Sequence, residues 1–225
     1  MNPNSMKRKC FIFDLDGVIV DTAKYHFQAW RALAKELGID FSIEQNEKLK
    51  GISRVRSLEK ILEWGDQKLE PYEFQNKMNQ KNENYLEFIS NMNTTELLPD
   101  VHRVLKYLTR NNQFIALGSA SKNARLILKK VKISGLFDVI VDGNDVTKAK
   151  PNPEVFLKAA YKTKCNPKNC IVFEDSVAGI KASNQAGMIS IGIGDSSILN
   201  EAQYNFKNFK ELNNAFLDQL IKNIK

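Results

Sequence analysis

Four acidic residues in this chain of 225 residues stand where they could do chemistry together. Asp14 and Asp16 directly follow one short apolar run, and Glu174 and Asp175 follow another. A pair of aspartates before a glycine is also typical of a simple turn. A turn does not explain the second acidic pair, so we interpret the four carboxylates as parts of one site.

Such a cluster of carboxylates predicts a bound cation. The carboxylates repel one another, and a cation relieves that repulsion. Mg²⁺ prefers hard oxygen ligands and completes its shell with water or phosphate oxygens. A carboxylate beside it can attack phosphorus, and an aspartyl phosphate divides one difficult transfer into two easier ones. The sequence therefore predicts a magnesium-dependent phosphoryl-transfer enzyme with Asp14 as nucleophile. Asp16 is close enough in sequence to act as general acid and base.

Two further residues could stabilise the transferring group. Ser119 follows the apolar run 114–117 and could donate from its hydroxyl and its backbone amide. Lys150 could supply a positive charge. Taken alone, Ser119 is more typical of a turn or a cap, and Lys150 of an exposed surface. Their joint placement with the acidic pairs favours the catalytic interpretation.

Short apolar runs predict the strands that position these residues. Helical patterns alternate with the later runs, which is typical of an α/β domain with a mostly parallel sheet. In such sheets ligands bind at the carboxyl ends of the strands, where both acidic pairs would meet. The predicted strands are 10–13, 114–117, 139–141, 171–173 and 189–191.

The first strand is not followed by a single crossover helix, because the pattern is helical throughout 21–91. Asp21 or Thr22 could cap a helix that ends at Gly38. We predict a small all-helical insert over 21–91, and a core domain formed by 1–20 and 92–225. Further helices are predicted over 57–64, 72–89 and 101–109, after 121, from 153 and over 176–186.

Composition limits the class of protein. No run approaches the roughly 20 apolar residues of a membrane span, and residues 1–9 lack the pattern of a secretory signal, so we expect a cytoplasmic protein with no membrane partner. Cys10, Cys165 and Cys170 suit a reducing compartment and are expected to be packing residues. The net charge is +7, but the basic residues are scattered, so no nucleic-acid partner is expected. Nothing demands more than a monomer.

Four motifs in order resemble the haloacid dehalogenase superfamily. Residues 13–18 match its first motif, Ser119 the second, Lys150 the third and residues 174–176 the fourth. The resemblance covers nearly the whole chain. It implies a Rossmann-like core and a helical cap of the four-helix type inserted after the first strand. It also implies that Asp14 is the nucleophile and Asp16 the general acid and base.

Residues 21–26, 49–54 and 119–123 resemble more closely the sugar-phosphate mutases of this superfamily. That resemblance implies an intramolecular phosphotransferase, an isomerase, that interconverts β-D-glucose 1-phosphate and D-glucose 6-phosphate. The reaction would pass through an aspartyl-phosphate enzyme and β-glucose 1,6-bisphosphate. Mg²⁺ and a catalytic trace of the bisphosphate, acting as an activator, are the implied cofactors. Sugar phosphates are the implied small-molecule partners.

The same resemblance implies a role for each matching residue. The phosphate that is not being transferred would be held by Arg54, Ser121, Lys122 and Asn123. The sugar or the cap hinge would be lined by Thr22, His26, Lys50, Gly51, Ser57 and Lys81. The metal would be held by Asp14, the backbone carbonyl of Asp16, Glu174 and Asp175. Trp30 is expected to pack inside the helical insert and not to contact a ligand.

Two other functions are compatible with these motifs. The first is a sugar-phosphate phosphatase of the same fold, which would need no second phosphate site; the segment 50–54 is therefore the discriminating feature. The second is a binding protein that keeps the fold without catalysis. The intact set of Asp14, Asp16, Ser119 and Lys150 argues against that second alternative.

Overall fold

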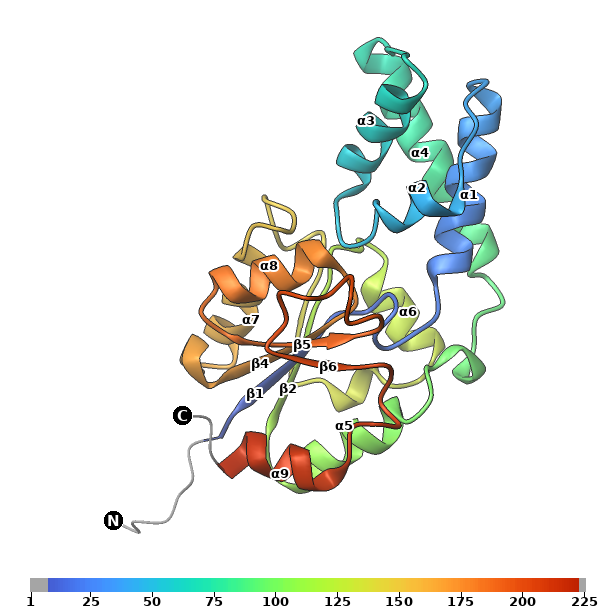
Figure 1. Ribbon diagram of the computed structural model, residues 1–225. Helices are drawn as coiled ribbons and strands as arrows, with labels where there is room; N and C mark the ends of the chain where they lie inside the picture. The colour runs from blue at the N-terminus through green and yellow to red at the C-terminus, as the bar shows by residue number, and fades with distance from the viewer. Residues whose placement is uncertain (1–7, 223–225) are drawn as a thin grey trace.

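The computed structural model describes residues 8–222 (Figure 1). Residues 1–7 and 223–225 lie outside the described part. The segment 1–9, in which we expect no secretory signal, therefore falls mostly outside it as well. Within residues 8–222, no helix combines the length and the apolar character needed to cross a membrane.

A single parallel sheet forms the centre of the larger part of the molecule. Its strand order is β3-β2-β1-β4-β5-β6, and each described pair of neighbours is parallel. The five strands expected from apolar runs are present. β6 was not predicted, because it is short and partly exposed and so lacks an apolar run. The strands are β1 (Cys10–Phe13), β2 (Phe114–Gly118), β3 (Val139–Val141), β4 (Cys170–Glu174), β5 (Ile189–Ile193) and β6 (Tyr204–Phe206).

Helices cover both faces of the sheet, so its central strands are buried on both sides. Alternate residues of a strand point to opposite faces. Phe11 and Phe13 therefore pack toward α5, α6 and α9, whereas Cys10 and Ile12 pack toward α7 and α8 (Figure 1). α9 was not predicted. These helices are α5 (Val101–Arg110), α6 (Ala124–Lys130), α7 (Glu154–Lys162), α8 (Val177–Gln185) and α9 (Asn214–Lys222), with short 3₁₀ turns at Thr94–Glu96, Ser134–Leu136 and Pro167–Asn169.

The three cysteines are free thiols. Cys10 and Cys170 are buried and lie in register on β1 and β4. Cys165 is half-buried and packs against the same apolar cluster. These positions agree with the packing role expected from the sequence.

Four helices, here called the helical unit, stand apart from the sheet at its upper edge in Figure 1. They enclose an apolar cluster of their own, which includes Trp30, Leu58 and Ile61. α3 begins three residues earlier than predicted, because the Ser53 side chain accepts a hydrogen bond from the backbone of Arg56 and caps it. The helices are α1 (Ala23–Glu36), α2 (Ile43–Glu47), α3 (Arg54–Trp64) and α4 (Pro71–Phe88).

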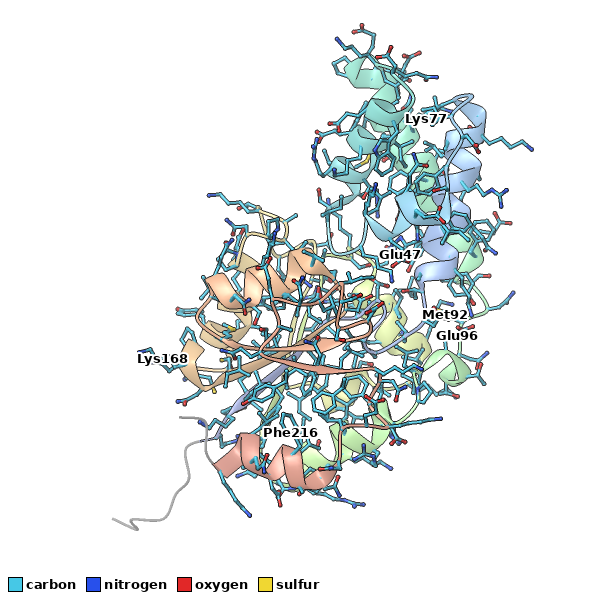
Figure 2. All side chains as sticks on the ribbon, viewed as in Figure 1. Glu47, Lys77, Met92, Glu96, Lys168 and Phe216 are labelled. Carbon is cyan, nitrogen blue, oxygen red and sulfur yellow. The ribbon has the colours of Figure 1, made fainter. Side chains whose placement is uncertain are left out.

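Two connectors join the helical unit to the sheet, and they pair with each other. Leu98 donates its backbone N–H to Ile19 at 3.0 Å, and Asp21 donates to Glu96 at 3.1 Å. The Glu96 carboxylate also accepts hydrogen bonds from Lys24 at 2.8 Å and from a tyrosine hydroxyl of α1 at 2.7 Å. Figure 2 shows Met92 and Glu96 between the two parts of the molecule. The helical unit is thus attached by one short paired ribbon.

Candidate active site

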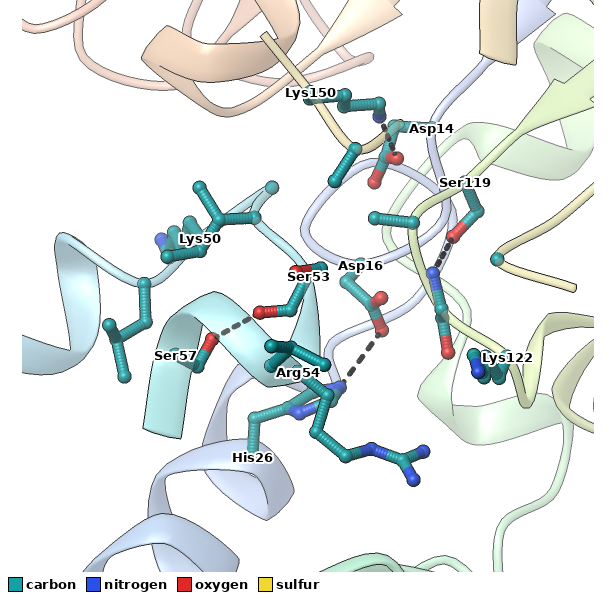
Figure 3. A pocket seen from close by; sticks show the side chains of 18 of the residues that line it. Asp14, Asp16, His26, Lys50, Ser53, Arg54, Ser57, Ser119, Lys122 and Lys150 are labelled. Carbon is teal, nitrogen blue, oxygen red and sulfur yellow. Dashed lines mark hydrogen bonds and ion pairs between the residues drawn. The ribbon is translucent and has the colours of Figure 1, made fainter. Parts of the chain in front are cut away.

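A cavity of about 480 Å³ lies between the helical unit and the carboxyl edge of the sheet (Figure 3). Both parts of the molecule contribute its walls. All the site residues expected from the sequence line it except Thr22 and Glu174. The expected residues on its walls are Asp14, Asp16, His26, Lys50, Gly51, Arg54, Ser57, Lys81, Ser119, Ser121, Lys122, Asn123, Lys150 and Asp175.

Asp14 lies at the carboxyl end of β1 and is 5% exposed. The Nζ of the buried Lys150 is 2.5 Å from Asp14 Oδ1 and 3.4 Å from Glu174 Oε1. Burial lowers the pKa of Lys150, but the negative charges of Asp14 and Glu174 outweigh burial and raise it. Lys150 therefore remains a cation, in contact with the carboxylate that would attack phosphorus.

Asp14 is one of three carboxylates that lie close together. One oxygen from each of Asp14, Glu174 and Asp175 lies within 4.8 Å of the others. Glu174 Oε2 is buried without a hydrogen-bond partner among the described residues. Burial raises the pKa of Glu174 well above its usual range, and burial with the Asp14 charge raises that of Asp175 to about 7. The buried ammonium beside them, that of Lys150, does not balance three carboxylates, and this cluster of hard oxygen donors fits Mg²⁺.

Two glycines make room for these carboxylates. A Cβ on Gly17 would lie 2.1 Å from Asp175 Oδ2, and one on Gly179 would lie 1.7 Å from Glu174 Oε1. Ser176 donates its hydroxyl to Glu174 Oε1 at 2.5 Å and caps α8 by accepting from the backbone of Gly179 at 3.1 Å. The sequence indicated Ser176 only as part of a motif, and the contacts of Ser176 and Gly179 with Glu174 explain why a hydroxyl and a residue without a side chain stand at these two positions.

Asp16 is half-buried and accepts a hydrogen bond from the Thr22 hydroxyl. Thr22 precedes α1, but its side chain forms no capping bond to the helix. Thr22, one of the two residues expected to cap this helix, does occupy the N-cap position, but its hydroxyl is directed toward Asp16 and makes no capping bond. Burial, and then the charge of Asp14, raise the pKa of Asp16 to about 6. A carboxyl group with such a pKa can hold or release a proton near neutral pH.

His26 faces Asp16 from α1, with its Nε2 3.9 Å from Asp16 Oδ1 (Figure 3). Its Nδ1 is 3.0 Å from the Nζ of Lys81, which is buried over the rings of Trp30 and Tyr85. Burial and the Lys81 charge lower the pKa of His26, which keeps it neutral. Burial and the Arg54 charge lower the pKa of Lys81 to about 7; in its ammonium form Lys81 only donates, so Nδ1 then accepts and the ring proton stands on Nε2 toward Asp16.

Ser119 is fully buried at the end of β2. Its backbone N–H donates to Val141 at 3.0 Å, so the expectation that this amide is free to bind a ligand is wrong. Its hydroxyl oxygen accepts from the backbone of Ser121 at 3.1 Å, as Figure 3 shows. The hydroxyl hydrogen remains available to the cavity, which leaves one of the two expected donors.

Basic and amide groups gather at the end of the cavity away from Asp14. Figure 3 shows Arg54 and Lys122 there, on the opposite side from Lys150. Asn123 lines the same end, and its backbone N–H donates a hydrogen bond to Ser121 Oγ at 3.2 Å. The structure therefore brings together the four residues expected to hold a second phosphate.

The segment before α3 reaches across to the sheet. Lys50 Nζ lies 3.7 Å from Asp175 Oδ2. Gly51 has a φ of +74°, and a Cβ there would lie 2.3 Å from Ser176 Oγ. Ser57 is buried and donates its hydroxyl to the Ser53 carbonyl at 3.0 Å. The helical unit is thus in close contact with the edge that carries the carboxylates.

Sequence reasoning missed part of the wall. Trp30 packs inside the helical unit as expected, and it also lines the cavity. The loop 143–149 was missed altogether. Its two charged residues, Asp145 and Lys148, match no motif, and only its position after β3, at the carboxyl edge, could have indicated it. Its lining residues are Gly143, Val146, Thr147, Lys148 and Ala149.

Comparison with known proteins agrees with this geometry. The family model of the haloacid dehalogenase-like hydrolases matches residues 11–193. The chain is 45% identical to the β-phosphoglucomutase of Bacillus subtilis (strain 168) over 188 residues, which cover 83% of each chain. It is 30% identical to a fructose-1-phosphate phosphatase of Escherichia coli (strain K12) over 182 residues, 81% of this chain and 94% of that one.

A solved structure is similar over almost the whole length. The crystal structure of β-phosphoglucomutase from Clostridium difficile superposes with a TM-score of 0.91 at 41% sequence identity. The match covers 95% of this chain and 97% of the other. The expected fold class, an α/β core with an inserted helical part, is confirmed.

Proposed function

Because the chain belongs to the haloacid dehalogenase-like hydrolase family, we propose that its cavity catalyses the β-phosphoglucomutase reaction. This reaction interconverts β-D-glucose 1-phosphate and D-glucose 6-phosphate. One observation carries the proposal: a single cavity has the Asp14 carboxylate paired with the Lys150 ammonium at one end and a separate group of basic and amide side chains at the other. Moving a phosphate between two positions of one sugar needs both ends. The similarity to two β-phosphoglucomutases supports the same reaction.

In the proposed reaction Asp14 attacks the phosphorus of a sugar phosphate and becomes an aspartyl phosphate. Asp16 gives its proton to the departing sugar oxygen, and in the return step it takes a proton from the attacking hydroxyl. The pKa of about 6 for Asp16 suits both directions. Lys150 balances negative charge beside the transferring group, and the Ser119 hydroxyl donates to one of its oxygens.

Mg²⁺ is the cation that the family implies, and the cluster of Asp14, Glu174 and Asp175 fits it. We propose that the backbone carbonyl of Asp16 completes the protein ligands. When bound, Mg²⁺ supplies positive charge next to the phosphate oxygens and reduces the repulsion between the carboxylates. Its presence would also favour the ionised forms of Glu174 and Asp175, whose pKa values are raised in the protein alone.

The far end of the cavity would hold the phosphate that is not being transferred. The Arg54 guanidinium can bind a phosphate through two N–H groups at once, and Lys122 adds a point charge. The bisphosphate would be released or turned over so that its other phosphate meets Asp14. A trace of β-glucose 1,6-bisphosphate would then be needed to phosphorylate Asp14 at the outset, as an activator.

We propose that residues 21–91 act as a cap on a core formed by 1–20 and 92–225. The paired connectors near Val20 and Leu97 are suited to a hinge. Closure would exclude water, which a mutase must do so that a sugar hydroxyl and not water attacks the aspartyl phosphate. Thr22, His26 and Lys81 would hold Asp16 in place, while Lys50, Gly51 and Ser57 would line the sugar.

A coupled assay tests the mutase reaction. Each anomer of glucose 1-phosphate is supplied with Mg²⁺ and a trace of bisphosphate, and glucose 6-phosphate and inorganic phosphate are measured in parallel. We expect glucose 6-phosphate from the β anomer, dependence on Mg²⁺, and little inorganic phosphate. Rapid release of inorganic phosphate without formation of the isomer would contradict the proposal and favour a sugar-phosphate phosphatase, as in the similar protein of Escherichia coli.

Arg54→Ala separates the two functions further. A phosphatase that acts on an aryl phosphate does not use a second phosphate site, whereas the mutase does. We expect the variant to lose roughly 100-fold in mutase kcat/KM, because two charged hydrogen bonds are removed. Its hydrolysis of 4-nitrophenyl phosphate should change little. Equal losses in both activities would speak against the assignment of Arg54 to the second phosphate.

A further inference from the structure

Asn82 on α4 joins two groups at the phosphate end of the cavity. Its Oδ1 accepts a hydrogen bond from Arg54 Nη2 at 2.7 Å and another from Asn123 Nδ2 at 3.0 Å. Arg54 belongs to α3 of the helical unit, whereas Asn123 lies just before α6 on the sheet side. One carboxamide oxygen therefore connects the two parts of the molecule at this place.

Asn82 lies behind the wall and not in it. Arg54 and Asn123 line the cavity, but Asn82 is not among the lining residues and is half-buried. Sequence reasoning gave it no role. A direct contact between Asn82 and a bound sugar phosphate is therefore not what the structure suggests, and any influence on the ligand would pass through its two partners.

The contacts leave the partners able to bind an anion. A guanidinium carries five N–H groups, and a carboxamide nitrogen carries two. The acceptor at Asn82 uses one from each, so the remaining donors of Arg54 and the second N–H of Asn123 are free to face the cavity. An acceptor placed behind two donors fixes their planes and aims them at the same point, which lowers the loss of side-chain freedom on binding.

We propose that Asn82 is a positioning residue for the second phosphate site, which holds Arg54 and Asn123 together across the two parts of the molecule. The proposal rests on the proposed function only in taking a sugar phosphate as the ligand. It further implies that the site is assembled when the helical unit meets the sheet, since Arg54 and Asn123 come from different sides of that contact.

Asn82→Ala tests the proposal through binding. We expect the Kd for glucose 6-phosphate, measured by calorimetry with Mg²⁺ present, to rise about tenfold, as for loss of hydrogen bonds to a charged group. The mutase KM should rise similarly with a smaller change in kcat. Hydrolysis of 4-nitrophenyl phosphate, which lacks a second phosphate, should stay within about twofold of the wild type.

The controls separate positioning from general damage. Asn76→Ala makes the same chemical change at an exposed site on the same helix, and we expect wild-type binding. Asn82→Ser is a second variant that can replace Asn82→Ala if the alanine variant folds poorly. Its side chain is polar but too short to reach both partners, so we expect the Kd for glucose 6-phosphate to rise about tenfold here too. In an Arg54→Ala background, the further effect of Asn82→Ala should shrink to about twofold.

The outcomes distinguish this proposal from the proposed function. Unchanged binding of glucose 6-phosphate in both Asn82 variants would overturn the positioning role, whatever reaction the wild type catalyses. A full tenfold loss that persists in the Arg54→Ala background, or an equal loss toward 4-nitrophenyl phosphate, would overturn it too. If the wild type forms no isomer but Asn82→Ala still weakens binding, the mutase reaction fails and the positioning role stands.

Discussion

At the scale of single residues, two aspartates two positions apart have different surroundings. Asp14 has the Lys150 ammonium against one oxygen, at 2.5 Å. Asp16 instead accepts a hydrogen bond from the Thr22 hydroxyl and faces the neutral ring of His26. Burial and the Asp14 charge favour the protonated form of Asp16. The environment thus suits Asp14 for attack as a carboxylate and Asp16 for exchanging a proton.

The two half-reactions should depend on pH with opposite signs. Transfer from β-glucose 1,6-bisphosphate to Asp14 requires protonated Asp16, so its rate should fall about tenfold per pH unit above the Asp16 pKa of about 6. Transfer from the aspartyl phosphate to a sugar hydroxyl requires ionised Asp16, so its rate should rise with pH and level off above that value. Rapid-quench measurements of each half-reaction test this. Two profiles of the same sign would contradict the role of Asp16.

Asp16→Asn gives the matching substitution. The side chain keeps its size but cannot exchange a proton, so we expect kcat to fall by roughly 10²–10⁴-fold. Mg²⁺ affinity should stay within about twofold by calorimetry, since only the backbone carbonyl of residue 16 is proposed to bind the metal. Asp21→Asn, at an exposed position in the nearby connector, is the control and should retain activity. Loss of Mg²⁺ affinity in Asp16→Asn would contradict this division of roles.

At the scale of elements, the junction of β4 and α8 shapes the carboxylate cluster. β4 ends at Glu174, and Ser176 both caps α8 and hydrogen-bonds Glu174. Gly179, in the first turn of α8, lies directly against the Glu174 side chain. The beginning of the helix therefore decides where a buried carboxylate points, although Gly179 itself has no functional group.

Gly179→Ala should separate metal binding from stability. A Cβ there would lie 1.7 Å from Glu174 Oε1, so the Glu174 side chain must move. We expect Mg²⁺ affinity to fall about 10–100-fold, as for other changes that disturb a metal ligand. Stability toward urea should not fall in parallel, because alanine favours helix by about 1 kcal/mol over glycine. Gly135→Ala, with no atom within 4 Å of the added carbon, is the control. Unchanged Mg²⁺ affinity in Gly179→Ala would show that Glu174 does not need this space.

At the scale of the whole molecule, apolar cores on both faces of the sheet and one inside the helical unit support one site between them. The core on one face of the sheet includes Phe13, Phe173 and Phe209, whereas the helical unit has its own around Trp30. Two connectors join the parts, and Ala29 and Tyr85 of the helical unit also belong to the sheet-side core, so a change in the angle between the parts would alter contacts at that boundary but leave the core around Trp30 intact. This arrangement suits a cap that closes over a sugar phosphate and opens again to exchange it.

Phe209→Ala tests how the C-terminal segment contributes to the sheet core. Phe209 is 1% exposed, and its ring centre lies 5.5 Å from that of Phe173 and 6.2 Å from that of Phe13. We expect the free energy of unfolding by urea to fall by about 3–5 kcal/mol, from lost burial and the cavity left behind. Tyr161→Ala, at a side chain that is 83% exposed, should change it by less than about 0.5 kcal/mol. Similar values for both would mean that the segment after β6 is not part of the cooperative core.

The sequence by itself determined the order of the strands β1 to β5 along the chain and the residues at their carboxyl ends. Apolar runs indicate buried parallel strands, and the ends of such strands share one edge, so Asp14, Ser119 and Glu174 could be expected to meet. β6, α2 and α9 were missed. β6 is short and partly exposed, and its surroundings rather than a local pattern decide that it pairs with β5.

Only the tertiary structure decided the contacts made between elements. No spacing along the chain shows that the Thr22 hydroxyl donates to Asp16, or that Lys81 meets His26. Asn82 stands next to Lys81 in sequence, yet it contacts Arg54 and Asn123. Such contacts depend on the rotation of α1, α3 and α4 and on their distance from the sheet, which packing of whole surfaces sets and local sequence does not.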